Sequence, residues 1–473
     1  MSELELASDE FERLAAAAVA ALAEHWRTLP GTPAIGHPGG ETVARGLAGE
    51  PCPETGRDFA DILSTLFEVA VPPSFGTTHP GFLAYVPGGG LPAAALGQFL
   101  AAGINRYVGL YAAAPALAQL EANVLRWFAE MLGLPAATRG LFTSGGSLAG
   151  ATALVTARRE RLSENFLNGV IYVSDQTHHA IAKAAVLAGF PDRNIRSIPS
   201  DRHFRLDLAA LETAIRQDRA AGATPFLVVG NAGTTNTGAV DPLPAIAEIA
   251  AREGLWFHID AAYGGFYRLT ERGRAVLAGI ERADSVVLDP HKGLFLPYGT
   301  GALLVRDGAA LARAHHVAAD YLPPPPDVPE AADFQALSPE LTRPFRGLGV
   351  WLPFHLHGVA AFRAALDEKL DLARWITTEL PTIPHLQLVA APELTILAFR
   401  LEPPGLDGEA LDCLNQAWLD RTHARGRVFL SGTRLHGRFT PRIAIQSFRT
   451  HREQVAACLA DLRAAAEELT QGV

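Results

Sequence analysis

Cysteine is scarce in this chain of 473 residues and occurs only as Cys52, Cys413 and Cys458. The three lie far apart and form no CxxC pair, so the sequence contains neither a disulfide framework nor a cysteine-based zinc motif. The acidic N-terminal segment MSELELASDEFERL also lacks the basic and then apolar pattern of a signal peptide. We therefore expect a protein of the reducing cytoplasm.

Two further absences exclude classes of partner. No stretch reaches about 18 uninterrupted apolar residues, which argues against a membrane span. No basic tail or cluster is present and the formal net charge is −10, so nucleic acid is not an expected partner. Apolar residues make up 48% of the chain and charged residues 19%, which indicates a folded protein with a large core.

Lysine is also rare, because only Lys183, Lys292 and Lys369 occur among the 40 Lys and Arg residues. Arginine keeps its proton, so these three are the candidates for chemistry that needs a free amine. Lys183 lies in the middle of a predicted helix and Lys369 on a charged helix face, and we expect both to be solvated. Lys292 directly follows an apolar strand in DPHKGLF, where a charge is costly unless it is used. Lys292 is therefore the candidate functional lysine.

Short apolar runs alternate with helical segments in the middle of the chain. Because such strands are covered on both faces, the pattern predicts an α/β fold with a mostly parallel sheet. A proline-rich segment at 321–334 is expected to be an exposed loop. Beyond it, helices at 349–379 and 451–468 and further strands predict a small C-terminal α+β domain. The predicted strands of the two parts lie at 169–174, 225–230, 255–260, 284–289 and 301–306, and at 394–401, 427–431 and 440–447.

Polar residues follow the ends of the predicted central strands. SDQTHHA follows 169–174, NAGTTNTG follows 225–230, Asp260 ends 255–260, and PHKG follows 284–289. Ligands of open α/β sheets bind beyond the carboxyl ends of the strands, so we expect these residues to converge on one site. The histidine pairs have neither cysteine partners nor an HExxH spacing, and no metal site is expected.

A Gly/Ser turn stands directly before a helix in TSGGSLAGATALVTAR, with Gly145 and Gly146 in the turn. A helix N-terminus offers free N–H groups and a partial positive charge, so this turn predicts a phosphate cradle. It matches neither GxxxxGK[ST] nor GxGxxG, which argues against an NTPase or a dinucleotide fold. A phosphate cradle with His, Thr, Asp and Lys on successive strand ends is the set that pyridoxal 5′-phosphate (PLP) requires.

The motifs THPGFLAYVPGGG, TSGGSLAGATALVTAR, SDQTHHA, GTTNTGAVDPL, HIDAAYGG and DPHKG resemble those of the group II PLP-dependent amino acid decarboxylases. Their order and spacing over about residues 75–450 are most similar to the aromatic-L-amino-acid decarboxylase branch of that family. The resemblance implies the type I fold of PLP-dependent transferases (aspartate aminotransferase-like), PLP as the cofactor, and a homodimer with shared active sites. It divides the chain into a helical dimerisation segment at 1–75, a large PLP-binding α/β domain at 76–355, and a small C-terminal α+β domain at 356–473.

The resemblance also implies roles for single residues. Lys292 matches the lysine that binds the cofactor aldehyde, Asp260 the carboxylate paired with the pyridine nitrogen, and His178 the imidazole stacked over the ring. The other positions that match cofactor contacts are Gly145, Gly146, Ser147, Thr235, Ala262, Asp289 and His291.

Two positions depart from the family pattern. The family often has Asn where this chain has Asp289, and a second negative charge beside a phosphate would be unfavourable. Counting back without gaps from LTRPFRGL, Phe334 falls where aromatic amino acid decarboxylases carry a mobile-loop tyrosine that protonates Cα. Relatives with phenylalanine there can divert the carbanion to oxygen and yield an aldehyde. Tyr321 is an alternative donor.

The substrate pocket is expected to be aromatic. Tyr85, Tyr107 and Tyr111 match pocket positions, the last two in a stretch that lines the neighbouring subunit's pocket, and Phe82 is a further candidate. Gly109 stands where the family tends to place a bulky residue, which predicts a roomier pocket. Decarboxylation of an L-amino acid, with aromatic substrates favoured, to the amine and CO₂ is the expected reaction.

Three other functions compete with this one. The nearest is a PLP-dependent aromatic aldehyde synthase, which would release ammonia and peroxide beside CO₂. A carbon–carbon lyase of the sphingosine-phosphate type shares the sheet and the lysine but needs a site for a phosphate headgroup. A scaffold without activity is disfavoured because Lys292, Asp260 and His178 are all present.

Overall fold

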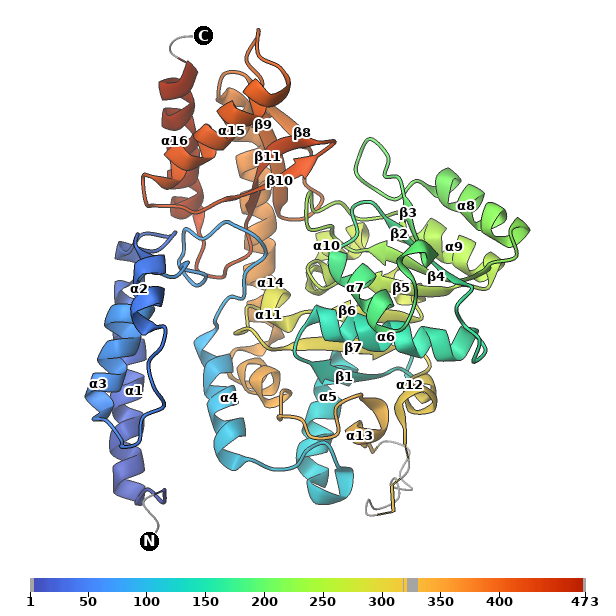
Figure 1. The fold of residues 1–473 in the computed structure, drawn as a ribbon, viewed down its shortest axis with the longest axis horizontal. Coiled ribbons are helices and arrows are strands. Elements are labelled where there is room, and N and C mark those ends of the chain that lie inside the picture. The colour runs from blue at the N-terminus through green and yellow to red at the C-terminus, as the bar shows by residue number, and fades with distance from the viewer. Residues whose placement is uncertain (1–3, 318, 321–330, 471–473) are drawn as a thin grey trace.

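The computed structural model describes residues 4–317, 319–320 and 331–470. Its N-terminal helices stand together, beside α4 and apart from the central sheet (Figure 1). They are α1 (Ser8–Thr28), α2 (Gly40–Leu47) and α3 (Phe59–Ser64), with the π-helical turn Thr65–Ala70 and α4 (Pro92–Ile104) following. The sequence of α1 is amphipathic, yet none of its residues is buried. The apolar stripe of α1 is therefore free to cover another surface.

The central sheet has seven strands in the order β1-β7-β6-β5-β4-β2-β3. Their bounds are β1 (Arg139–Thr143), β2 (Gly169–Ser174), β3 (Ile195–Ile198), β4 (Thr224–Asn231), β5 (Trp256–Asp260), β6 (Ser285–Leu288) and β7 (Gly301–Val305). β7 runs antiparallel to both of its neighbours, and the other strands run in one direction. Every residue of β2, β6 and β7 is buried, as expected for strands covered on both faces. The expected mostly parallel sheet is confirmed.

Helices connect and cover these strands (Figure 1). They are α5 (Pro115–Leu132), α6 (Gly146–Arg161), α7 (His179–Leu187), α8 (Leu208–Ala220), α9 (Leu243–Glu253), α10 (Glu271–Val276), α11 (Pro290–Gly293), α12 (Gly308–His315) and α13 (Phe334–Leu337). α6, α7 and α11 begin within a few residues of β1, β2 and β6, so their first turns lie at the carboxyl edge of the sheet.

A long helix, α14 (Leu348–Glu379), leads to the C-terminal α+β part of the chain. The helix passes through the expected domain boundary at 355–356 and is interrupted by Gly358, whose φ is +72°. The four-stranded sheet that follows is antiparallel, in the order β10-β11-β9-β8. It comprises β8 (Leu386–Ala390), β9 (Ile396–Leu401), β10 (Ser431–Leu435) and β11 (Arg438–Ala444), with α15 (Gly408–His423) and α16 (Arg452–Thr470).

One strand of this sheet differs from the sequence prediction. The apolar run 427–431 does not form a strand of its own and makes only an isolated bridge between Phe429 and Phe82. The strand begins at Ser431 instead and forms a hairpin with β11. His436 and Gly437 both have positive φ at the turn, which is the geometry of a tight two-residue hairpin.

Lys369 corrects a second prediction, because it is fully buried rather than solvated. Its ammonium donates to the Thr450 carbonyl and lies 2.8 Å from Glu368 Oε2. The other carboxylate oxygen of Glu368 contacts His451. The charged face of α14 was predicted to be exposed, but α14 packs there against α16 and the segment before it. Burial lowers the pKa of Lys369. Lys183 is exposed on α7, as expected.

No helix within the described part of the chain is long and apolar enough to cross a membrane.

Candidate active site

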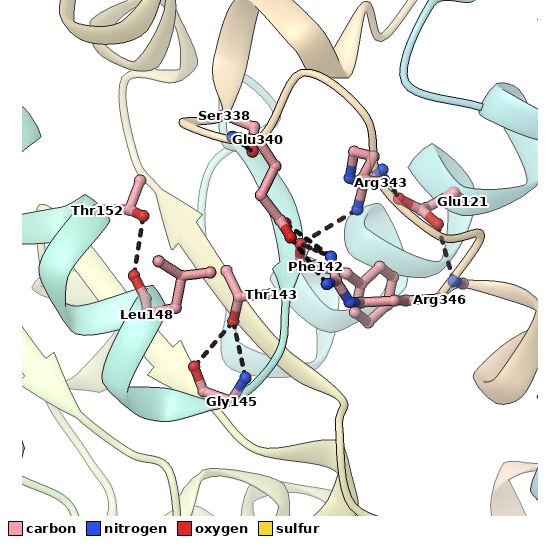
Figure 2. Close-up of polar contacts among 11 residues, drawn as sticks. Glu121, Phe142, Thr143, Gly145, Leu148, Thr152, Ser338, Glu340, Arg343 and Arg346 are labelled. Atoms are coloured by element: carbon pink, nitrogen blue, oxygen red, sulfur yellow. Dashed lines mark hydrogen bonds and ion pairs between the residues drawn. The ribbon is translucent and has the colours of Figure 1, made fainter. Parts of the chain in front are cut away.

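The turn between β1 and α6 has little room for side chains. A Cβ added to Gly146 would lie 3.0 Å from Asp289 Oδ2, and one added to Gly301 would lie 2.5 Å from the Gly145 backbone. The Thr143 hydroxyl donates to the Gly145 carbonyl at 2.9 Å and accepts from the Gly145 N–H at 3.3 Å (Figure 2). These contacts hold the start of α6 in place, and the free N–H groups of its first turn form a cradle for an anion.

A cavity of about 510 Å³ lies in front of this turn, at the carboxyl edge of the central sheet. Most of the residues singled out in the sequence line it. They are Tyr85, Gly145, Gly146, Ser147, His178, Thr235, Asp260, Ala262, Asp289, His291 and Lys292. Tyr107, Tyr111 and Phe334 are not among its lining residues.

Asp260 is the last residue of β5 and is half-buried at the edge of this cavity. Its Oδ1 accepts the Ala262 N–H at 3.1 Å, which fixes the carboxylate against the following turn. His258 lies two residues earlier on the same face of β5, with its Nδ1 2.8 Å from Ser285 Oγ. Burial lowers the pKa of His258 to about 4, although the Asp260 charge acts in the opposite direction. His258 is therefore a neutral group behind the carboxylate.

His178 is the N-cap residue of α7 and faces the same cavity. Its Nδ1 accepts the Ala180 N–H at 3.2 Å, so Nε2 carries the proton of the neutral ring. Burial lowers the pKa of His178, and the opposing attraction of Asp260 is smaller. The imidazole is therefore an uncharged, fixed plane at neutral pH.

Lys292 lies in the single turn of α11, directly after β6. Its Nζ is 2.8 Å from Asp289 Oδ2. His291 Nδ1 donates to the Thr300 carbonyl at 2.7 Å, which leaves Nε2 of that ring as an acceptor 3.6 Å from Asp289. Burial lowers the pKa of His291. The cavity thus holds an amine with a carboxylate beside it.

A buried polar network joins the lysine to the C-terminal sheet. Gln446 Nε2 donates to the Lys292 carbonyl at 3.3 Å, and the Tyr267 hydroxyl donates to Gln446 Oε1 at 2.8 Å. Thr395 Oγ1 lies 2.7 Å from the Tyr263 hydroxyl and 2.9 Å from the Tyr267 hydroxyl. Sequence analysis missed this network because its members come from segments far apart in the chain.

Arg442 is a further lining residue that sequence analysis missed. Arg442 is 3% exposed, and its guanidinium donates to Ser431 Oγ at 3.1 Å and to the Tyr85 carbonyl at 3.2 Å. No carboxylate among the described residues pairs with it. Burial lowers the pKa of Arg442 to about 10, so it remains a cation at neutral pH. A lone arginine inside the apolar run TPRIAI is the sequence signal that could have found it.

Tyr85 is held by the same contacts. Its N–H donates to Ser431 Oγ at 3.1 Å while its carbonyl accepts from Arg442. Its φ is +52°, which is the left-handed region that non-glycine residues rarely occupy. The two contacts hold this strained backbone at the wall of the cavity.

Phe334 differs from the expectation that it lies in an exposed lid. It begins α13 and is fully buried, with the Arg343 guanidinium 4.7 Å from the centre of its ring. Asp333 next to it accepts the Tyr111 N–H at 2.9 Å. These contacts anchor the segment although its sequence has no apolar periodicity. Tyr321 and the proline run lie outside the described residues.

The Arg343 guanidinium also forms a fully buried ion pair with Glu121. Figure 2 shows Arg343 and Arg346 pointing at the Phe142 carbonyl of β1, just before the cradle, with Glu340 paired to Arg346. Arg343 therefore ties the segment that follows Phe334 to the strand that leads into the cradle.

Gly109 has a different explanation from the one expected. A Cβ on Gly109 would lie 2.8 Å from the Leu341 carbonyl, which also accepts the Tyr107 hydroxyl at 3.1 Å. The glycine permits the close approach of the 338–343 segment, so it does not by itself indicate a roomier pocket.

We expect Arg343→Met to lower the free energy of unfolding by about 3–5 kcal/mol, because Glu121 would be left buried and unpaired. Urea unfolding followed by circular dichroism measures this. The double variant Glu121→Gln/Arg343→Met serves as the control and should recover a large part of the loss. Equal stability of Arg343→Met and the wild type would contradict a charged pair at this position.

A mostly parallel sheet, a lysine after a strand end, a strand-end aspartate and a helix-start cradle at one cavity together define a PLP-dependent enzyme of the type I fold. The comparisons with known proteins agree. The family described as "Pyridoxal-dependent decarboxylase conserved domain" matches residues 44–402. The chain belongs to this family, and its cofactor is pyridoxal 5′-phosphate.

Individual relatives cover nearly the whole chain. Aromatic-L-amino-acid decarboxylase of Bacillus atrophaeus is 36% identical, over 99% of this chain and 98% of its own. The crystal structure of Oryza sativa TDC with PLP and tryptamine is 27% identical, covers 99% of both chains and has a TM-score of 0.93. Rhodiola rosea 4-hydroxyphenylacetaldehyde synthase is 26% identical over 99% of both chains, with a TM-score of 0.89.

Proposed function

We propose that the protein decarboxylates an aromatic L-amino acid to the corresponding amine and CO₂. The observation that supports this best is that Lys292, Asp260 and His178 line one cavity beside an anion cradle, in a chain of the decarboxylase family. The aromatic substrate is supported by the relatives named for aromatic amino acids and by Tyr85 in the cavity wall. Bound PLP supplies the electron sink for the Cα–carboxylate bond that breaks.

The residues of the cavity fit this cofactor. Lys292 would hold its aldehyde, Asp260 its ring nitrogen, and His178 one face of its ring. The cradle has free N–H groups and no side chain at Gly145 and Gly146 to block a phosphate. The remaining residues that we propose to contact PLP are Ser147, Thr235, Ala262, Asp289 and His291.

Asp260, His178 and Arg442 would each have a separate task. Asp260 would hold a proton on the ring nitrogen, because a carboxylate and a pyridinium stabilise each other where water is scarce. His178 is neutral, so it would cover the ring and exclude water without adding charge. Arg442 gives the wall a positive charge that attracts the carboxylate of an amino acid.

A screen of the proteinogenic amino acids and DOPA for CO₂ release tests the proposal, read together with assays for amine, aldehyde and peroxide. We expect release with one or more of tryptophan, tyrosine, phenylalanine and DOPA, in a ratio of one amine per CO₂. Release from acidic or aliphatic amino acids alone would overturn the aromatic substrate but not the reaction. Absence of release from every amino acid would overturn the reaction.

The alternative product is the aldehyde. Its support is that aldehyde synthases occur among the relatives and that this chain has phenylalanine at 334. In the described conformation, however, Phe334 is buried beneath Arg343 and does not line the cavity of its own chain. We therefore keep the amine as the proposed product.

We expect Phe334→Tyr to lower stability by about 1–3 kcal/mol, because the added hydroxyl would be placed at a fully buried ring. The ratio of amine to aldehyde should stay unchanged in air. Thermal unfolding and product analysis measure the two effects. A rise in the ratio of amine to aldehyde would show instead that residue 334 stands at the proton-donor position of the assembled enzyme.

We also propose a homodimer with shared active sites. Large apolar residues of α1 and α4 are about half exposed, among them Phe11, Val19, Leu96 and Phe99. An apolar surface of this kind is normally covered by a partner. Tyr107 and Tyr111 match pocket positions of the family but lie away from the cavity of their own chain, as expected for residues that serve a neighbour.

We expect Phe99→Asp to shift the protein toward the monomer and to lower turnover, since a charge would be buried in the interface. Sedimentation velocity measures the shift. Leu187→Asp is the matched control, because Leu187 is exposed on α7 and outside the proposed interface. A wild type that sediments as a monomer at micromolar concentration would contradict the dimer.

We further propose that the enzyme works in the cytoplasm. All three cysteines are free, which suits a reducing compartment. Cys458 is buried, and burial raises its pKa, so it is an inert core residue.

A further inference from the structure

Asp289 is a buried carboxylate with one cation beside it. Its side chain is 2% exposed, and its Oδ2 lies 2.8 Å from Lys292 Nζ. Its Oδ1 is also buried and accepts no hydrogen bond from the described residues. A carboxylate in such a position depends on its one cation, because an unpaired buried charge is strongly unfavourable.

The same carboxylate lies at the anion cradle. Asp289 Oδ2 is 3.0 Å from the place where a Cβ of Gly146 would be, and Oδ1 is 2.9 Å from that of Gly301. The carboxylate therefore fills the space beside the first turn of α6. A phosphate bound there would lie beside this carboxylate, and two like charges in contact are unfavourable.

We propose that Asp289 is the counter-ion of Lys292 in the cofactor-free protein, and that cofactor loading has to separate this pair. The inference rests on the proposed roles of Lys292 and the cradle. When PLP binds, the Lys292 nitrogen bonds to the aldehyde carbon, and the aldehyde oxygen leaves as water with two of the ammonium hydrogens. The Asp289 carboxylate is then left beside the phosphate without the Lys292 ammonium as its partner.

The histidines near Asp289 do not replace Lys292 as its cation. His291 Nδ1 donates to the Thr300 carbonyl, and its Nε2 lies 3.6 Å from Asp289 Oδ2. Burial lowers the pKa of both His291 and His178, so both rings are neutral at neutral pH. Lys292 is therefore the cation that pairs with Asp289.

We therefore expect Asp289 to weaken the binding of PLP at the cradle. Asp289→Asn keeps the shape of the side chain but removes both the ion pair and the negative charge. We expect this variant to bind PLP roughly tenfold more tightly at pH 8, which corresponds to about 1.4 kcal/mol in binding free energy. The ratio of the wild-type Kd to the variant Kd should therefore be about ten at this pH.

Titration of the cofactor-free full-length protein with PLP, followed by the absorption of the bound cofactor, measures this ratio. Asp371→Asn is the matched control, because it removes one carboxylate from an exposed surface position. A ratio near one, or weaker binding by Asp289→Asn, would overturn the proposal.

A second measurement needs no cofactor. In the cofactor-free protein, Lys292→Ala should lower Tm by a few degrees because Asp289 loses its cation, whereas Lys292→Ala in the Asp289→Asn background should leave Tm nearly unchanged. Equal shifts in the two backgrounds would overturn the counter-ion role. If Lys292→Ala lowers Tm only when Asp289 is present but PLP is bound at another lysine, the ion pair stands and the proposed cofactor site is wrong.

Discussion

Borohydride reduction of the yellow holoenzyme is expected to fix the cofactor on Lys292, and Lys292→Ala is expected to lower kcat by roughly 10⁴-fold or more. Lys292 is a cavity-lining lysine directly after a strand end, and it is 25% exposed. The amine is therefore reachable, and its removal would take away the proposed covalent anchor of the cofactor. Peptide mapping of the reduced protein and steady-state kinetics of the variant measure the two effects.

The scarcity of lysine makes this mapping decisive. Lys369 is fully buried with its ammonium bound to the Thr450 carbonyl, so it cannot reach an aldehyde in the folded protein. Lys183 is exposed on α7, and Lys183→Arg serves as the control that should keep full activity. Label on Lys183 or Lys369 in the folded enzyme would refute the assignment of the site.

Asp260→Asn should retain PLP but lose about three orders of magnitude or more in kcat, which corresponds to about 4 kcal/mol in the barrier. An amide cannot hold the proton on the ring nitrogen, and a neutral ring is a weaker electron sink. The replacement is nearly isosteric and keeps the acceptor for the Ala262 N–H, so the fold should be preserved.

The absorption spectrum and thermal stability of Asp260→Asn separate this effect from unfolding. The variant should still bind PLP and melt within a few degrees of the wild type. A kcat within about tenfold of the wild type, about 1.4 kcal/mol in the barrier, would show that Asp260 is not the electronic partner of the ring.

The central fold could be predicted because its signals are local. Apolar β-branched runs such as 169–174 and 255–260 correspond to strands that are buried on both faces. The antiparallel direction of β7 could not be predicted in this way, because its sequence GALLV reads like that of a parallel strand. Its direction follows from the short connection from α11, which returns the chain without a crossover helix.

The site shows the same division. Asp260, His178 and Lys292 lie at strand ends, and the rule for α/β sheets brings them together without knowledge of packing. Arg442 belongs to β11 of the C-terminal sheet and Gln446 follows this strand, and only the tertiary structure brings them to the cavity and the lysine. Lys369 was misjudged for the same reason, since its acceptor, the Thr450 carbonyl, is 81 residues away.

The strained backbone of Tyr85 has a mechanical consequence. Its N–H and its carbonyl are both bound by residues of β10 and β11, so this wall of the cavity is attached to the C-terminal sheet and not to the central one. A rotation of the C-terminal sheet would move Tyr85 toward or away from Asp260 while the central strand ends stay in place. The width of the cavity beside Tyr85 therefore depends on its contacts with Ser431 and Arg442. We expect changes at Ser431 to alter the substrate range without any change in the residues proposed to carry the chemistry.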